Sequence, residues 1–361
     1  MCPANLATYH PAAETLLEYA THGCPTHTGL PWSRQTMQAA IDRGPHISAL
    51  EPAAILQLRE EVTEKIKAKQ ARVVKWDDIK DDPPPELKIS PIAMVPHKSR
   101  PYRAILDLSF PVKLSTEVEQ KSVNAATLKT APRQAIDQIG HSLSRIIHAF
   151  ATADPKAKIF MAKWDIKDGF WRLDCRTGEE WNFCYVLPNI DPNAPIELVV
   201  PTSLQMGWVE SPPYFCTASE TARDVAAQYA ETPMDSLPNH KFLSLTNKSD
   251  DFLALPESAT PSKFQYLVEV YMDDYIAAAI ATERRQLNHL SNAVMYGIHD
   301  VFPPDENDED DPISLKKLKK KEGSWALVKD ILGLTFDGDN KTVWLEDAKR
   351  DAILTILQGW I

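Results

Sequence analysis

The spacing of apolar residues predicts several amphipathic helices. Between residues 50 and 70, Ala54, Leu58, Val62 and Ile66 recur every four positions, which places them roughly on one face of a helix. Residues 132–153 repeat such spacing at three and four positions. Two more helices are predicted over residues 211–230, behind prolines, and over residues 282–296.

Other segments carry short apolar runs bounded by turn residues, which is typical of strands. Residues 92–110 predict two strands joined by a polar, basic turn, and a buried strand is predicted to end at Asp165. The remaining strands are predicted in pairs: residues 181–188 with 196–202, residues 264–281 around a tight turn, and residues 329–345 around an Asp-Gly-Asp-Asn turn.

This mixed order of helices and antiparallel hairpins predicts an α+β fold with a central sheet packed on helices. The chain has 28 prolines and only 12 glycines, and the prolines mark loops such as residues 83–85 and 303–304.

Composition is ordinary for a globular protein. Of 361 residues, 43% are hydrophobic and 25% are charged, and no run approaches the ~20 apolar residues of a membrane span. The first residues lack the basic and apolar regions of a secretory signal. Five cysteines, odd in number and without paired spacing, are typical of reduced thiols. We therefore expect an intracellular protein, cytoplasmic or nuclear, without a membrane partner.

The charge distribution bears on possible partners. A net charge of −11 argues by itself against nucleic acid, because phosphate binding favours a basic surface. Acidic residues gather in residues 305–312, however, and basic residues in 64–75, 96–103 and 316–321. Local patches matter more than the sum, although each run alone is typical of a solvated surface.

Two adjacent carboxylates lie between apolar runs in the segment VEVYMDDYIAA, residues 268–278. Asp273 and Asp274 fall at a predicted hairpin tip, where aspartate also serves as an ordinary turn residue. A further carboxylate, Asp165, ends another apolar strand. If the two strands are neighbours in one sheet, these carboxylates face one point. Their repulsion is costly unless a cation lies among them, and magnesium prefers such oxygen ligands.

Five motifs in order resemble those of reverse transcriptases from retroviruses and retrotransposons. Together they span roughly residues 51 to 340, and their sequences are most similar to those of the retrotransposon type. They resemble the fingers hairpin (HKSRPYRAILDLS, 97–109), the first catalytic aspartate motif (DIKDGF, 165–170), the segment beneath template and nucleotide (LQMGWVESPPYF, 204–215), the hairpin with two catalytic aspartates (YMDD, 271–274) and the primer grip (ILGLTF, 331–336).

The resemblance implies an RNA-directed DNA polymerase that works with two Mg²⁺ ions, with Mn²⁺ as the alternative metal. It implies Asp165, Asp273 and Asp274 as the catalytic, metal-binding carboxylates, of which Asp274 contributes less directly. The backbone carbonyl of Ile166 is implied as a further metal ligand. A primed RNA or DNA template and deoxynucleoside triphosphates are the implied partners. The oligomeric state is not predicted.

The resemblance also implies nucleotide-binding residues, among them Ile166, which is already named as a metal ligand. Arg103 matches the arginine that grips the triphosphate, and Lys98 its lysine partner, with Arg100 as the alternative. Phe170 matches the steric gate that leaves no room for a 2′-hydroxyl, unless its ring is simply part of the core. Gly207 is expected to allow close backbone approach beside the template base.

Three neighbouring positions are left more open. Either Lys316 or Lys317 is implied as the lysine that assists the leaving pyrophosphate, unless both belong to a solvated basic run. Trp208 is predicted as a local packing anchor. Met206 departs from the glutamine of many viral enzymes, which puts a contact with the sugar hydroxyl in doubt.

The resemblance divides the chain into parts of a right-handed polymerase. We expect an N-terminal extension of unknown role (1–50), fingers (51–140, with 176–206 returning to them), a palm (141–175 and 207–345) with a surface insertion near 231–263 and an acidic loop near 300–312, and the start of a truncated thumb (346–361).

Two other functions compete with this one. A catalytically weak or inactive retroelement-derived nucleic-acid-binding domain is favoured by the negative charge and the truncated thumb, but the three intact aspartates oppose it. An RNA-dependent RNA polymerase is opposed by YMDD in place of the usual GDD, and by Phe170.

Overall fold

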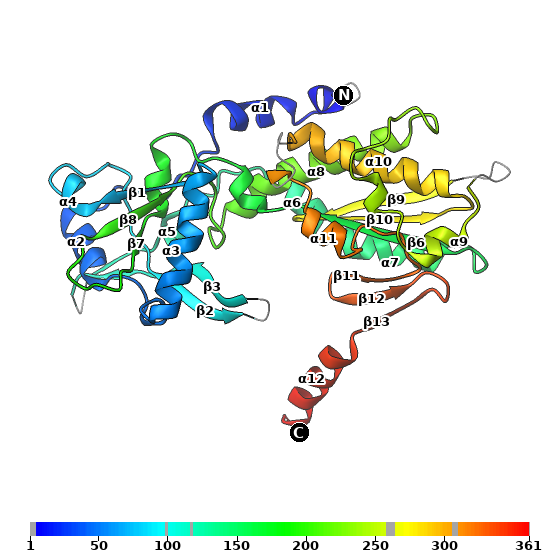
Figure 1. Cartoon of the computed structure of the whole chain (residues 1–361). Helices are drawn as coiled ribbons and strands as arrows, with labels where there is room; N and C mark the ends of the chain where they lie inside the picture. Colours follow the sequence, from blue (N-terminus) through cyan, green and yellow to red (C-terminus); the bar gives the residue numbers. More distant parts are fainter. Residues whose placement is uncertain (1–4, 98–99, 116–117, 258–263, 305–309, 361) are drawn as a thin grey trace. The chain divides into compact units, whose positions relative to one another are not determined.

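A computed structural model describes residues 5–97, 100–115, 118–257, 264–304 and 310–360 (Figure 1). The described residues of 1–13, 133–167 and 216–361 form one compact unit, unit 1. Those of 14–132 and 168–215 form a second, unit 2. Both combine helices with small antiparallel sheets, which is an α+β fold as predicted. Within these ranges, no helix has the length and apolarity needed to cross a bilayer.

Unit 2 contains a three-stranded sheet of order β1–β8–β7 and two strand pairs, β2–β3 and β4–β5. Its strands are β1 (Ala71–Lys75), β2 (Ile92–His97), β3 (Arg100–Leu106), β4 (Val112–Lys113), β5 (Glu119–Gln120), β7 (Tyr185–Leu187) and β8 (Glu197–Pro201). Its helices are α1 (Ala13–His22, which begins in unit 1), η2 (Ile47–Ala49), α2 (Arg34–Arg43), α3 (Pro52–Lys67), α4 (Trp76–Ile79), α5 (Val123–Ala126), η3 (Gly169–Arg172) and η4 (Glu179–Phe183).

Unit 1 contains a central sheet of order β6–β10–β9 and a smaller one of order β11–β12–β13. Its strands are β6 (Ile159–Asp165), β9 (Gln265–Tyr271), β10 (Asp274–Ile280), β11 (Val328–Ile331), β12 (Leu334–Asp337) and β13 (Thr342–Leu345). Its helices are η1 (Leu6–Tyr9), α6 (Gln134–Ile139), α7 (Ser142–Thr152), α8 (Ser211–Ala230, which begins in unit 2), η5 (Leu243–Leu245), α9 (Asp250–Ala254), α10 (Arg284–Val301), α11 (Leu315–Lys319) and α12 (Asp347–Gln358).

Helices cover both faces of the central sheet of unit 1. In Figure 1, α8 and α10 lie along one side of β9, β10 and β6, and α7 lies along the other. On the α7 side, Phe150 packs with Met161, Ile276 and Phe336 in one buried cluster. Burial on both faces explains why β6 and β10 read as continuous apolar runs in the sequence.

The predicted hairpins 92–110, 181–202 and 264–281 are confirmed as β2–β3, β7–β8 and β9–β10. Residues 329–345 form three strands where two were predicted. The missed feature is a two-residue turn at Leu332–Gly333, where both residues have positive φ (50° and 82°). Two positive φ values match the twist of a tight hairpin, and Gly333 adopts its value without a side-chain penalty.

Two predicted segments differ from expectation. The helix predicted over 132–153 is split into α6 and α7 at Gly140, because glycine is a weak helix former. The last position of the predicted α3 face, Ile66, is 42% exposed.

The predicted surface insertion is partly a core element. Within residues 231–257, Leu237, Phe242 and Phe252 are buried, and the His240 amide donates to Asn292 Oδ1 of α10 at 3.0 Å. Because the segment is polar and rich in prolines, its composition gave no sign of these few buried residues. Residues 258–263 lie outside the described residues, as do 305–309 of the predicted acidic loop.

A buried polar network joins this segment to α10. His299 Nε2 lies 2.9 Å from Asp311 Oδ1, and His299 Nδ1 lies 3.0 Å from His240 Nε2. Lys241 Nζ lies 2.8 Å from Asp311 Oδ2. Burial alone would raise the pKa of Asp311, but its hydrogen bonds with His299 and Lys241 outweigh burial and lower the pKa to about 2.

Asp311→Asn is expected to lower the free energy of unfolding by about 2 kcal/mol at pH 6, because the unfolded aspartate binds protons more readily than the folded one. This contribution is complete above about pH 4 and is lost as the pH falls from about 4 through about 2. Denaturant unfolding at pH 6 and pH 3 measures it. The neighbouring exposed variant Asp310→Asn is the control, with an expected change within about 0.5 kcal/mol. A difference between Asp311→Asn and wild type that grows toward acid would contradict the account.

Candidate active site

The register of β6 and β10 brings the predicted carboxylates to one end of the central sheet. Asp165 and Asp274 are direct antiparallel partners, and the next pair is Trp164 with Tyr275. Cross-strand partners share a face, and successive residues alternate faces. Asp165 and Asp274 therefore lie on one face, and the two aromatic residues lie on the other.

These aromatic residues fix the strand ends that carry the carboxylates. Tyr275 is fully buried and its hydroxyl donates to the Ser219 carbonyl of α8 at 3.0 Å. Trp164 packs edge-on against Trp325 at 6.0 Å, and the Trp325 indole donates to Ser291 Oγ of α10 at 2.8 Å. Sequence reasoning missed this support, although a large aromatic residue next to each strand-end aspartate was a usable signal.

Asp273 lies in the turn between β9 and β10. The strands close on the Tyr271–Asp274 pair, so Met272 and Asp273 form a two-residue turn. Met272 has φ +57°, a left-handed conformation that costs a non-glycine residue about 1–2 kcal/mol. The Ile166 amide donates to the Asp273 carbonyl at 2.9 Å, which ties the turn to the end of β6. The strands on both sides hold this conformation in place.

Burial makes the ionised forms of Asp165 and Asp273 unfavourable. Burial raises the pKa of Asp165 to about 7, with added repulsion from Asp273 and Asp274 and an opposing effect of Lys317. Burial and the Asp274 charge also raise the pKa of Asp273. Among the described residues, the buried Oδ1 of Asp274 has no hydrogen-bond partner. A cation placed among these oxygens would relieve both the repulsion and the lost hydration.

The structure distinguishes between the two candidate lysines. The Lys317 ammonium forms an ion pair and hydrogen bond with Asp165 Oδ1, whereas Lys316 is exposed. Lys317 is half-buried, and burial alone would lower the pKa of its ammonium group. The hydrogen bond to Asp165 and the charge of Asp165 outweigh burial and raise this pKa above its usual value. Its predicted role toward pyrophosphate stays a prediction.

The donor set suits a hard divalent cation, although the side chains are not gathered around one point. In the part of the chain that the structure describes, no three His, Cys, Asp or Glu side chains form a ready metal-binding group. Lys317 engages Asp165, and Asp273 lies one position beyond the strand that holds Asp274. Carboxylate oxygens are nevertheless the ligands that Mg²⁺ prefers, and the buried Oδ1 of Asp274 has no hydrogen-bond partner in the described part of the chain.

Of the predicted nucleotide-binding residues, Arg103, Phe170 and Gly207 lie in unit 2, and Ile166 lies in unit 1. Arg103, on β3, donates from Nη2 to the Met206 sulfur at 2.7 Å. The Phe170 ring is half-buried and packs edge-on against Phe215 at 5.5 Å, so it is at least in part a core residue. Lys98 lies outside the described residues.

Gly207 and Trp208 have structural roles within unit 2. Gly207 has φ +97°, and a Cβ there would lie 3.3 Å from the Leu106 carbonyl oxygen, so both backbone conformation and space favour glycine. Trp208 is fully buried, stacks on Tyr214 at 6.0 Å and donates to Thr127 Oγ1 at 2.9 Å. The prediction of a packing anchor at Trp208 is confirmed.

Comparisons with known proteins leave the family open. No family model and no curated protein matches the chain. Among solved structures, the chain is similar to a foamy viral protease-reverse transcriptase in complex with double-stranded DNA. The TM-score is 0.47 and the identity 16%, over 98% of this chain and 55% of that one. The chain thus spans about half the length of that protein. A likeness at this level carries no argument about function, which therefore rests on the residues of this chain.

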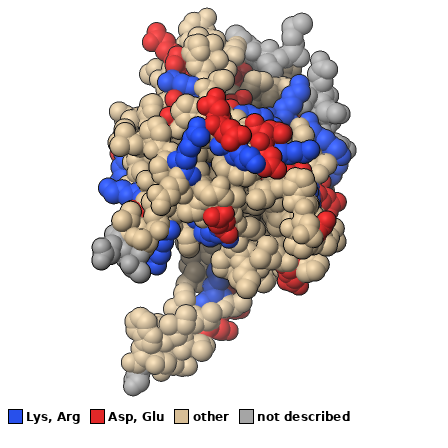
Figure 2. Space-filling model, turned by 90° about the vertical axis from the view of Figure 1, so that its left-hand side faces the viewer, with Lys and Arg blue, Asp and Glu red and all other residues tan. Residues whose placement is uncertain are grey.

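On the side that Figure 2 presents, the described residues form no purely basic face. Figure 2 shows Lys and Arg side chains interspersed with Asp and Glu on the side it presents. Two of the five basic residues in the predicted run 64–75 form ion pairs: Lys65 lies 3.4 Å from Asp168, and Arg72 lies 2.7 Å from Glu180. Lys67, Lys69 and Lys75 are exposed.

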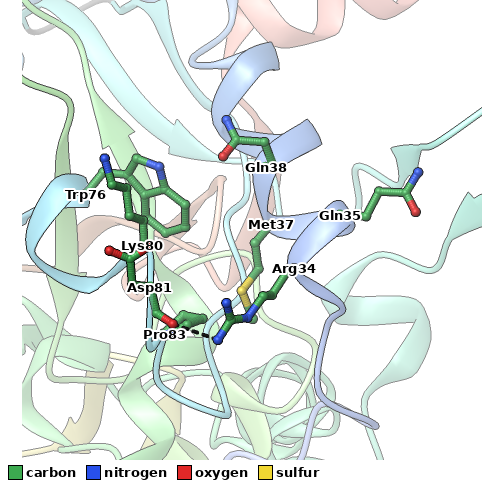
Figure 3. Close-up of a pocket in the computed structure, with 8 residues that line it drawn as sticks. All are labelled: Arg34, Gln35, Met37, Gln38, Trp76, Lys80, Asp81 and Pro83. Atoms are coloured by element: carbon green, nitrogen blue, oxygen red, sulfur yellow. Dashed lines mark hydrogen bonds between the residues drawn. The ribbon is translucent and has the colours of Figure 1, made fainter.

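A separate pocket of about 370 Å³ opens on unit 2 beside α2 and α4 (Figure 3). The Trp76 ring forms one wall, and Arg34 donates to the Asp81 carbonyl at 2.6 Å. None of the predicted site residues that the structure describes lines it.

Proposed function

We propose that the chain is an RNA-directed DNA polymerase of retroelement type, which extends a primer with deoxynucleotides on an RNA or DNA template. The observation that carries the proposal is the register of β6 and β10. It pairs Asp165 with Asp274 and leaves Asp273 in the adjoining turn. Carboxylates held this rigidly on neighbouring strand ends suit phosphoryl transfer. The motif order of the sequence supplies the reaction class.

Asp165, Asp273 and Asp274, with the Ile166 carbonyl, are proposed to hold two Mg²⁺ ions, or Mn²⁺ in their place. When bound, such ions stabilise charge on the attacking and leaving oxygens of a phosphoryl displacement. The chain's own contribution is positioning. Trp164 and Tyr275 fix the strand ends, and the bond between Ile166 and Asp273 fixes the turn.

In this proposal the palm (141–175 and 207–345) lies mostly in unit 1, and the fingers (51–140 and 176–206) lie mostly in unit 2. Arg103 is proposed to bind the triphosphate, because its forked donors match phosphate oxygens. Its partner in the structure, the Met206 thioether, is a weak acceptor that a phosphate would readily replace. Lys98 is proposed as a second phosphate ligand and Gly207 as the position of close approach to the template.

Phe170→Val is expected to admit ribonucleotides, because the smaller side chain leaves room for a 2′-hydroxyl. We expect the ratio of deoxynucleotide to ribonucleotide incorporation to fall by about 100-fold. This corresponds to losing a steric discrimination of about 3 kcal/mol between the two substrates. Single-nucleotide incorporation with each substrate measures the ratio. Phe170→Tyr, which keeps the ring, should retain it. An unchanged ratio in Phe170→Val would refute the gate and leave Phe170 as a core residue only.

The proposed function is tested by incubating the protein with a primed RNA template, Mg²⁺ and either deoxy- or ribonucleotides. Extension with deoxynucleotides alone supports the proposal. Extension with ribonucleotides alone would identify an RNA polymerase. Binding of the primed template without any extension would identify a nucleic-acid-binding domain. The ion pair of Lys317 with Asp165 favours this last alternative, because it neutralises the site without a metal.

A further inference from the structure

A short segment that runs into α11, which we call the strap, lies against the carboxylate end of β6. The strap is residues 312–318, all within unit 1. Ile313 and Ile166 form an antiparallel bridge, and the Ser314 amide donates to the Asp165 carbonyl at 2.9 Å. The backbone of the strap is thus bonded directly to the residue that carries the first predicted catalytic carboxylate.

Packing of α11 sets which lysine faces Asp165. Leu318 is buried, and a Cβ added at Gly323 would lie 2.4 Å from its Cδ2, so the following turn closes tightly over it. With Leu318 directed inward, the adjacent Lys317 lies against Asp165, and Lys319 is exposed. The pairing therefore follows from the fold of the strap and is not a chance surface contact.

The Lys317 ammonium occupies the kind of position that a metal would take. It bonds to Asp165 and interacts with the charge of Asp274. Only 11% of the Asp165 side chain and 39% of the Lys317 side chain are exposed, so water screens the pair incompletely. A divalent cation that takes Asp165 as a ligand must compete with this ammonium.

We propose that Lys317 is a built-in counter-ion, which neutralises Asp165 in the absence of metal and is displaced when a divalent cation binds. The inference rests on the proposed function, because it concerns the same carboxylates. In this proposal the affinity of the site for metal depends on the position of Lys317 in the strap as well as on the three aspartates. It also explains how three acidic residues coexist at one end of the central sheet before any metal arrives.

The first test is the Mn²⁺ affinity of the protein without nucleotide or primer, measured by electron paramagnetic resonance of free Mn²⁺. Lys317→Gln removes the competitor, so its Kd should be about tenfold tighter than that of wild type, as expected for a partly buried ion pair. Lys319→Gln removes the same charge from the same helix and should stay within about twofold of wild type. Equal or weaker affinity in Lys317→Gln than in Lys319→Gln overturns the inference.

The second test uses the wild-type protein and does not depend on the folding of a variant. Acetylation of lysines by an activated ester, read by peptide mass spectrometry, reports which ammonium groups are free. Adding Mg²⁺ should raise the modification rate of Lys317 several-fold and leave Lys319 unchanged. A Lys317 rate that is unchanged or lower in Mg²⁺ overturns the inference.

The two proposals fail in different ways. If the protein extends primers but Lys317 neither competes with Mn²⁺ nor is released by Mg²⁺, only the counter-ion is refuted. If neither wild type nor Lys317→Gln binds Mn²⁺ and no primer is extended, the polymerase proposal itself is refuted and the counter-ion with it.

Discussion

Asp273→Asn is expected to reduce primer extension by about 1,000-fold or more, because it removes a charged ligand from the proposed site of phosphoryl transfer. The same change should leave the fold intact or more stable. Burial and the Asp274 charge raise the pKa of Asp273, so its ionised form is unfavourable in the folded protein. The extension rate is measured in Mg²⁺ and the melting temperature is measured in EDTA. Together they separate loss of chemistry from loss of structure.

Asp154→Asn is the matched control, because it makes the same chemical change at an exposed position after α7. Its extension rate should equal that of wild type. An Asp273→Asn variant that extends primers at the wild-type rate would show that this carboxylate takes no part in the reaction.

Gly297→Ala is expected to lower the free energy of unfolding by about 3 kcal/mol, although alanine is the better helix former by about 1 kcal/mol. Gly297 lies in α10, where a Cβ would fall 2.6 Å from the Ala226 amide nitrogen and 2.7 Å from the Ala222 carbonyl oxygen of α8. The obstructing atoms are backbone, so the two helices must move apart. Urea unfolding at pH 7 measures the loss.

Gly140→Ala serves as its control in the same unit. A Cβ at Gly140 would lie 3.4 Å from the Asp137 carbonyl oxygen, so it meets no comparable obstruction. We expect its stability to stay within about 1 kcal/mol of wild type. If Gly297→Ala is as stable as Gly140→Ala, α8 and α10 do not approach as closely as described.

Much of the secondary structure follows from local patterns. The strands that carry Asp165 and the Asp273–Asp274 pair are continuous apolar runs in the sequence because both faces of the central sheet are covered. The register was beyond sequence reasoning, because a slip of one residue moves every side chain to the opposite face. It took the structure to place Asp165 opposite Asp274 and not opposite Asp273.

The supporting residues were harder to predict because they are distant in sequence. Lys317 reaches Asp165 across 152 positions, and no local pattern separates it from the other lysines of its run. The anchors of residues 231–257 are few and lie in a polar segment, so composition indicated a surface insertion. The roles of Arg103, Phe170 and Gly207 toward a nucleotide stay predictions.

The most direct test of the central claim is a single-turnover assay with a primed RNA template and one deoxynucleoside triphosphate. It is run with Mg²⁺ or with EDTA, for wild type and for Asp165→Asn. The account predicts one pyrophosphate released per nucleotide added by wild type in Mg²⁺, and no addition in EDTA or by Asp165→Asn. Nucleotide addition by Asp165→Asn at the wild-type rate, or addition by wild type in EDTA, would contradict it.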